Sequence, residues 1–395
     1  MSPAYAASPH LDDVLHRWRE RLLITGAVLL AVSAAGLFSG AGDFLHAWLI
    51  GFLFCLGLAL GSMSFLMLQY LTGGAWGIVS RRVFEAATRT LPLVAALFIP
   101  VAIGMRTLYE WARPESVRQN ALLQHRQGYM NPAMFVIRAV VYFAVWMALS
   151  HYLNRWSAAE DEGFAEQPRK LAKMSAAGLI VYVFTITFAA VDWAESLQTQ
   201  WYSTMWGFLF VAGEGLAGIA FVILVLWLLR RAEPMSRVLR PAHFHDIGKL
   251  LLMMVMIWAY FSFAQLLIVW SGDLPHEIAY YLPRFLTSWG WLGVALVLAQ
   301  FLVPFLLLLS APLKRNALLL SMVAILVLVM RYMDLAWMVL PGYHKAAFHM
   351  SWLAITAPLG LLCIWSWLFL RELPRRPLLP IHAPELEEAL VHETE

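Results

Sequence analysis

Six charged residues lie inside or at the ends of apolar stretches of this 395-residue chain: the acids Asp192, Glu195, Glu214 and Asp334 and the arginines Arg138 and Arg331. A charge in apolar surroundings is costly, and such groups commonly serve ion or proton pathways. The six residues are therefore candidates for a proton path. We assign none of them a covalent catalytic role.

Glu214 lies deepest in its apolar stretch, between two glycines. An ionised carboxylate there is strongly disfavoured unless it holds a proton or pairs with a cation. Arg138 and Arg331 are the arginines at comparable depth, so we expect them to partner Glu214. We hypothesise an outer half-channel in which Asp192 and Asp334 continue this path outward.

Two of the charged pairs have helical spacing. Asp192 and Glu195 are three residues apart, as are Arg331 and Asp334, so each pair is expected to share a helix face. Two simpler interpretations stay open for these groups. They could be internal ion pairs that fix helix register, or side chains that reach the outer membrane interface. For Glu214 we favour the functional interpretation.

A second polar group, the inner polar cluster, comprises His245, Asp246 and Lys249 at the start of an apolar helix. It is most simply a polar helix start, because Asp246 near a helix N-terminus is favoured by the helix dipole. Gln69 and Gln265 lie within apolar stretches and are predicted to be hydrogen-bond partners between helices.

The composition indicates that these residues sit in membrane helices. The chain is 61% hydrophobic and 13% charged, whereas a soluble domain is about a quarter charged. Its net charge of +3 suggests no nucleic-acid partner. We expect an all-α integral membrane protein with about ten transmembrane helices. The apolar segments are 22–38, 44–71, 90–106, 132–153, 173–192, 203–229, 247–270, 286–310, 316–338 and 347–370.

The chain also repeats itself. Three matches fall in one order: the sequence GFLF at 51–54 and 207–210, the helix ends at 148–150 and 308–310, and Asp192 with Asp334. An even number of helices per repeat predicts two parallel four-helix bundles, helices 2–5 and 6–9, with helices 1 and 10 as flanks. The expected divisions are 1–21 (N-terminal segment), 22–43 (helix 1), 44–202 (first bundle), 203–346 (second bundle), 347–370 (helix 10) and 371–395 (tail).

Lysine and arginine set the expected orientation. Most of those outside the apolar segments lie in connections on the N-terminal side, which predicts a multi-pass membrane protein with both termini cytoplasmic. We interpret the first helix as uncleaved. We expect the 107–131 loop to fold over the outer face and to dock on a partner. The tail after Arg371 is rich in Pro and Glu and is expected to lie loose on the surface.

The cysteines and histidines argue against a redox centre in this chain. Cys55 and Cys363 form no CxxC or CxxCH motif, which excludes the usual iron–sulfur, c-type haem and zinc patterns. The histidines lie near the two surfaces rather than at mid-membrane: His46, His344 and His349 near the outer one, His151 and His245 near the inner one. We therefore expect no metal, no cofactor bound covalently or by metal ligands, and a colourless chain.

Several segments together resemble the F subunit of bacterial alternative complex III, within the NrfD-like, polysulfide-reductase membrane-subunit superfamily. They are 111–115 (WARPE), 122–127 (LLQHRQ), Arg138 in FVIRAVVYF, 245–252 (HDIGKLLL), 260–275 (YFSFAQLLIVWSGDLP) and 281–284. The resemblance covers nearly the whole chain and is most specific around 245–275. It implies ten helices with two four-helix bundles, in the bacterial inner membrane.

The resemblance also implies a function. Such a subunit belongs to a quinol-oxidising electron-transfer complex, with a quinone-binding or proton-conducting role and quinone or quinol as its ligand. The implied partners are the sister C-type membrane subunit, which is the better-supported quinol site, an iron–sulfur protein, multihaem and monohaem cytochrome c subunits, and lipids.

Two alternative functions stay open. A stand-alone proton-coupled secondary transporter would work without partners. A purely structural membrane anchor would leave turnover intact when its charges are removed.

Overall fold

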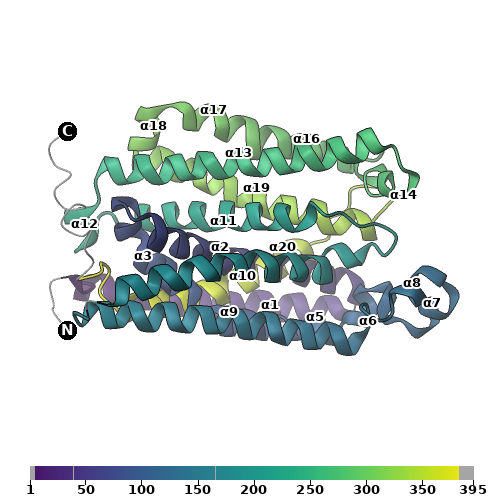
Figure 1. Cartoon of the computed structure of the whole chain (residues 1–395), viewed down its shortest axis with the longest axis horizontal. Helices are drawn as coiled ribbons and strands as arrows, with labels where there is room; N and C mark the ends of the chain where they lie inside the picture. The colour runs from purple at the N-terminus through teal and green to yellow at the C-terminus, as the bar shows by residue number, and fades with distance from the viewer. Residues whose placement is uncertain (1–4, 39, 165, 382–395) are drawn as a thin grey trace.

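The computed structural model describes residues 5–38, 40–164 and 166–381, and this part of the chain is helical without β-strands (Figure 1). It contains ten helical runs that are long and apolar enough to cross a membrane. The chain is therefore an all-α, multi-pass membrane protein, as the hydropathy pattern predicts.

Eight crossings are built on one long helix each, and the third and eighth are built from several pieces. The long helices are α1 (Pro9–Ala35), α2 (Ala41–Thr72), α9 (Pro132–Asp161), α10 (Gln167–Trp193), α11 (Trp206–Leu229), α13 (Pro241–Gly272), α19 (Ala317–Tyr343) and α20 (Leu353–Glu372). The third crossing comprises α3 (Ala75–Thr88), α4 (Leu91–Leu97) and α5 (Ile99–Ile103). The eighth comprises α16 (Trp289–Leu296), the π-helical turn η5 (Val297–Leu302) and α17 (Val303–Leu309).

Short helices make the connections. They are η2 (Gly36–Phe38), α6 (Met105–Leu108), η3 (Glu110–Ala112), α7 (Pro114–Gln119), α8 (Ala121–Arg126), η4 (Glu195–Leu197), α12 (Met235–Val238), α14 (Pro275–Ile278), α15 (Leu282–Phe285), α18 (Ala311–Arg315) and η6 (Leu373–Arg375).

Both described ends of the chain lie at one end of the molecule. The backbone N–H of Leu378 donates to the carbonyl of Tyr5 at 2.8 Å. We call this end the terminal face, and the opposite end, which carries α7, α8 and α14, the loop face (Figure 1). Which face meets the cytoplasm stays a prediction from the distribution of lysine and arginine.

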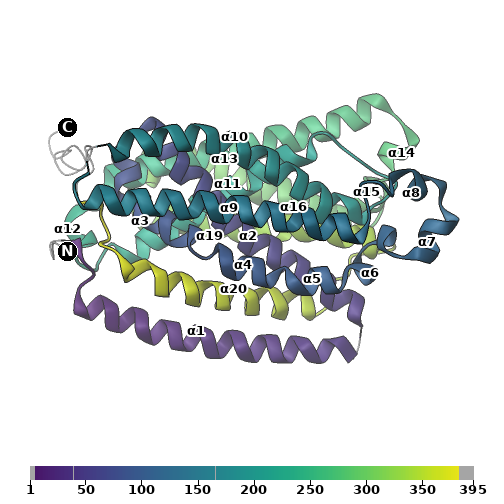
Figure 2. The ribbon, with the colours of Figure 1, turned by 60° about the horizontal axis from the view of Figure 1, so that its bottom comes forward.

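Helices α2 and α11 occupy the centre. Helix α2 contacts α3, α10 and α20, whereas α11 contacts α10, α13 and α19, and the two also pack on each other. They cross at Gly61 and Gly218, where a Cβ on Gly61 would lie 1.9 Å from the backbone oxygen of Glu214. Glycine at a crossing lets two membrane helices approach closely. Helix α1 packs along α20 at the edge (Figure 2).

The third crossing begins earlier than the predicted residue 90. Only Gly73 and Gly74, with φ of 66° and 98°, separate α2 from α3. Positive φ is readily adopted by glycine alone, so the chain reverses within two residues. The apolar pattern of the sequence does not reveal this helix, because the charged side chains of α3 lower its mean hydropathy.

The expectation of a loose tail is wrong for the described part of it. Leu378 and Leu379 are buried, and the backbone N–H of Ile381 donates to Asp161 at 3.1 Å. Burial of these two leucines holds the segment against the terminal face. Residues 382–395, the rest of the predicted tail, lie outside the described residues.

Candidate functional site

The first pair of predicted site residues lies near the loop face of α9 and α10. Asp192 accepts two hydrogen bonds from the Arg138 guanidinium, both at 2.8 Å, and one from the Tyr142 hydroxyl at 2.8 Å. Arg138 also lies 3.8 Å above the ring of Tyr129. This bidentate, buried pair locks two neighbouring helices together. The prediction that Arg138 partners Glu214 is therefore wrong.

Glu195 does not share the face of Asp192. Helix α10 ends at Trp193, so Glu195 falls in the short turn η4, where it accepts a hydrogen bond from the backbone N–H of Ser203. Both acids are almost fully buried within the protein. The interpretation that they simply reach the membrane interface is also wrong, because protein atoms cover them.

Glu214 sits at the meeting of three helices. The Tyr182 hydroxyl of α10 donates to it at 2.7 Å, and Arg331 of α19 interacts with it electrostatically. The Arg331 guanidinium lies directly against Gly213, since a Cβ there would come within 2.2 Å of the arginine Cζ. Glycine before Glu214 therefore makes the space that brings this cation alongside.

Arg331 and Asp334 share one face of α19, as predicted, and form an ion pair there, which was one of the two interpretations left open. The indole N–H of Trp258 in α13 donates to the same carboxylate at 3.1 Å. At 1.5 Å per residue, Glu214 and Asp334 lie about 12 Å and about 14 Å from the loop-face ends of their helices. Asp334, Arg331, Glu214 and Tyr182 thus form a buried polar row from α19 through α11 to α10.

A cavity of about 690 Å³ opens beside Asp334. Its walls come from α13, α16, η5, α19 and the 280–285 segment, and they are mainly aromatic and aliphatic. Several lining side chains, including Tyr260 and Phe263 of α13 and Val297 of η5, are largely exposed on the apolar flank of the molecule. The cavity therefore opens sideways between α13 and the eighth crossing, on the surface that lipid would cover.

The loop-face wall of the cavity is held by a fully buried arginine. Arg284 donates to the carbonyls of Tyr280 at 2.6 Å and Met338 at 2.7 Å, and its guanidinium lies 3.5 Å above the Tyr280 ring. Burial raises the pKa of Tyr280 to about 12, against the opposing effect of Arg284, and burial also raises the pKa of Tyr281. Both phenols therefore stay protonated at neutral pH.

The π-helical turn η5 forms another wall. A π-helix widens the helix by one residue and is frequent at functional sites. It carries Gln300, whose buried side-chain amide faces Asp334. Gln265 lines the same cavity and accepts a hydrogen bond from the Ser203 hydroxyl. The cavity thus combines one carboxylate with amide and phenol groups in an apolar enclosure.

The other predicted polar groups lie away from this site. His245, Asp246 and Lys249 are at the terminal-face start of α13, where Lys249 donates to Asp246 at 3.0 Å on the surface. This agrees with the simple interpretation of a polar helix start. Gln69 accepts from Arg81 of α3 at 3.2 Å, which confirms its predicted bond between helices.

Sequence reasoning missed a dense charge network at the terminal face. Arg81 pairs with Glu160 at 2.7 Å, and Arg82 pairs with Glu85 at 2.8 Å and with Asp161. These groups join α3 to α9, and Arg376 reaches Glu85 at 3.3 Å from the C-terminal segment. The i,i+3 spacing of Arg82 and Glu85 is the feature of the sequence that could have predicted part of this network. The acids and arginines of this network pair with one another. We therefore interpret the network as structural.

Comparison with known proteins adds no evidence about the family of this chain. No family model matches the chain, and no curated protein matches it.

Proposed function

We propose that this chain is a quinol-binding membrane subunit of an electron-transfer complex, as its resemblance to the F subunit of alternative complex III implies. The observation that carries the proposal is the lateral aromatic cavity with Asp334 on its inner wall. A quinol is a lipid-soluble ring with two hydroxyl groups, so its site needs entry from the membrane, apolar walls and buried acceptors.

The size and chemistry of the cavity support this ligand. Small-molecule sites usually measure about 300–1,000 Å³ and have apolar linings with a few placed polar groups. Protein interiors are otherwise packed as densely as organic crystals. An empty volume of about 690 Å³ next to a buried carboxylate is therefore better explained by a ligand than by helix packing.

The polar row behind the cavity supports a proton-accepting role. Oxidation of one quinol releases two electrons and two protons. We propose that the two electrons pass one after the other to a haem or iron–sulfur centre in a partner subunit, while Asp334 accepts the two protons in turn from the quinol hydroxyls and releases each one towards Glu214. Arg331 stabilises the charged form of Asp334, and Glu214 lies next along the row.

The test fills the cavity without touching the polar row. A Cβ at Gly293 would meet only the Trp337 ring, at 3.5 Å or more, so Gly293→Ala should be tolerated whereas Gly293→Leu projects into the cavity. In the assembled complex, a photoreactive azido-quinone should label the 256–301 region of the parent and of Gly293→Ala. Labelling and quinol turnover should fall at least about tenfold in Gly293→Leu.

A second control places the same bulk outside the cavity. Leu306 of α17 faces outward, so Leu306→Phe should leave labelling unchanged. Equal labelling and turnover in Gly293→Leu and Gly293→Ala would reject the quinol site. Proton-coupled transport by the isolated chain would favour the transporter, and full turnover after removal of the polar row would favour the structural anchor.

A further inference from the structure

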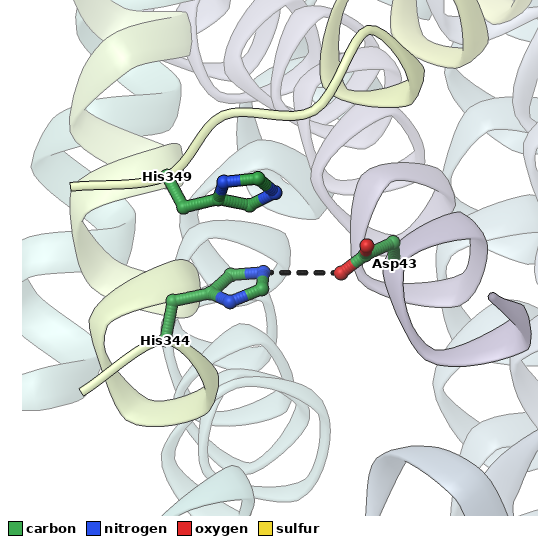
Figure 3. Close-up of side chains that lie close together, drawn as sticks. All are labelled: Asp43, His344 and His349. Atoms are coloured by element: carbon green, nitrogen blue, oxygen red, sulfur yellow. Dashed lines mark hydrogen bonds and ion pairs between the residues drawn. The ribbon is translucent and has the colours of Figure 1, made fainter. Parts of the chain in front are cut away.

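Three metal-binding side chains meet at the loop face, away from the cavity (Figure 3). They are Asp43 in the first turn of α2, His344 at the end of α19 and His349 in the connection to α20. Their ligand atoms all lie within 4.8 Å of one another. We propose that Asp43, His344 and His349 form a binding site for a divalent transition-metal ion of the Zn²⁺ class.

The chemistry of the set fits such an ion. Two imidazole nitrogens and one carboxylate oxygen are typical Zn²⁺ ligands, with bonds of about 2.0–2.2 Å. In a tetrahedral site such bonds place two ligand atoms roughly 3.3 Å apart. The Nε2 of His344 and the Oδ1 of Asp43 are already 3.0 Å apart. Three protein ligands leave a fourth position for water, so the ion would be exchangeable.

The backbone around the set is fixed. The indole of Trp289 donates to the carbonyl of His344 at 2.9 Å, and the N–H of His344 donates to Leu340 at 2.8 Å. Beside the other histidine, the N–H of Phe348 donates to the Ser288 hydroxyl at 2.7 Å. The segments that carry both imidazoles are therefore held in place.

Packing also brings Asp43 to the histidines. A Cβ on its neighbour Gly42 would lie 2.3 Å from the Tyr343 hydroxyl, so glycine lets α2 start this close to the end of α19 without displacing the Tyr343 side chain. The Tyr343 ring stacks on His46 with centroids 4.2 Å apart. The Nδ1 of His46 lies 2.8 Å from the carbonyl of Gly42. These contacts leave the Asp43 carboxylate facing the histidines.

An ion pair between Asp43 and His344 alone does not explain why His349 lies beside them. The rings of His344 and His349 are 4.6 Å apart, which is unfavourable if both are charged. Arg113, which acts electrostatically on the neighbouring His46 and Tyr343, directs its guanidinium to the carbonyls of Arg106 and Thr107 at 2.7 and 2.8 Å. A shared cation on the three ligands satisfies both imidazoles and the carboxylate. His349 is exposed, so the ion can enter from the aqueous side.

The experiment measures metal retention by the protein in its purified membrane form. After removal of metal with a chelator and dialysis against Zn²⁺, elemental analysis should find one retained zinc per chain in the parent. His349→Ala should lower the affinity at least about tenfold, because one of three ligands is gone. His276→Ala removes another exposed histidine of the same face and should bind like the parent.

Two further readouts separate specific binding from damage to the fold. Co²⁺ should give visible absorption bands in the parent and in His276→Ala but not in His349→Ala. Zn²⁺ should raise the Tm of the parent but not that of His349→Ala, whereas Mg²⁺ should change neither. Equal zinc retention by the parent and His349→Ala, or none in either, would overturn the site.

Discussion

The two carboxylates that the internal repeat matches, Asp192 and Asp334, lie in opposite kinds of surroundings. Around Asp192 the space is filled, because the Trp193 ring is fully buried and packs against Phe98 at 4.9 Å and Phe143 at 5.7 Å. Around Asp334 the equivalent space is a cavity of about 690 Å³. The matching acid thus lies among packed side chains in one half of the protein and beside a cavity in the other.

The helices that flank these acids differ in the same way. Helix α9 is one continuous α-helix, and its Arg138 reaches across to Asp192. Its counterpart in the repeat, the eighth crossing, is broken by the π-helical turn η5 and contains Pro304. A continuous helix packs closely along its neighbour, whereas a broken one leaves room. The second half therefore has an open space beside its acid, whereas the matching space in the first half is filled by side chains.

The largest expected effect comes from the crossing that joins the halves. Gly61→Val should prevent accumulation of folded protein, because a Cβ there would lie 1.9 Å from the backbone oxygen of Glu214 and a backbone atom cannot turn away. Membrane yield and size-exclusion profile are the measurements. Gly57→Ala, one turn earlier, is the matched control, since its Cβ would meet Glu214 at an ordinary 3.6 Å. A normal yield of folded Gly61→Val would mean that α2 and α11 do not approach each other this closely at Gly61.

The next prediction compares one tryptophan from each half. Trp193→Ala should lower the free energy of unfolding by about 3–5 kcal/mol, as expected for removal of a fully buried tryptophan. Trp337→Ala should cost less, because the Trp337 ring already borders the cavity and loses fewer contacts. Reversible unfolding in mixed detergent micelles measures both. Equal losses would mean that the cavity is filled in the folded protein.

The matched acids give a smaller and more specific contrast. Asp192→Asn should destabilise the protein by about 3 kcal/mol, because it leaves the mostly buried Arg138 without its charged partner. Asp334→Asn should cost less stability, because the Glu214 carboxyl group also lies beside Arg331, but it should impair quinol turnover. Thermal denaturation and turnover of the assembled complex test the pair. If Asp192→Asn is the variant that loses turnover at full stability, the assignment of the two halves is reversed.

Part of this contrast follows from sequence alone. Runs of apolar residues fix the number of membrane helices, because each crossing needs about 20 such residues. The pairing of Arg331 with Asp334 follows from i,i+3 spacing. The presence of buried carboxylates in the loop-face half of the helices follows from their isolation in apolar sequence.

Other features depend on tertiary packing that no local pattern encodes. Arg138 pairs with Asp192, 54 residues away, although depth alone allowed Glu214 as its partner. Glu195 does not share a helix face with Asp192, because α10 ends before Glu195. The cavity is a space between helices, and the charges of α3 hid a buried helix from hydropathy. Acids at matching places in the two repeats therefore predict where each carboxylate lies along its helix, but not which groups surround it.

The smallest structural effect is expected for Glu214→Gln, which removes a titrating group and keeps its shape. The amide oxygen can still accept the Tyr182 hydroxyl, and Arg331 keeps Asp334, so unfolding free energy should change by less than about 1 kcal/mol. If Glu214 passes protons onward from Asp334, turnover should fall about tenfold, because positioned proton transfer accelerates reactions by at least that much. The pH dependence of turnover should also change.

The matched control for this variant is Glu277→Gln, the same substitution at an exposed carboxylate of the loop face. It should leave turnover and pH dependence unaltered. Turnover of both variants is compared across pH in the assembled complex, with assembly and haem content checked first. Parent-like turnover and pH dependence in Glu214→Gln would make Glu214 a structural partner of Tyr182 and would confine the proton-accepting group of the second half to Asp334.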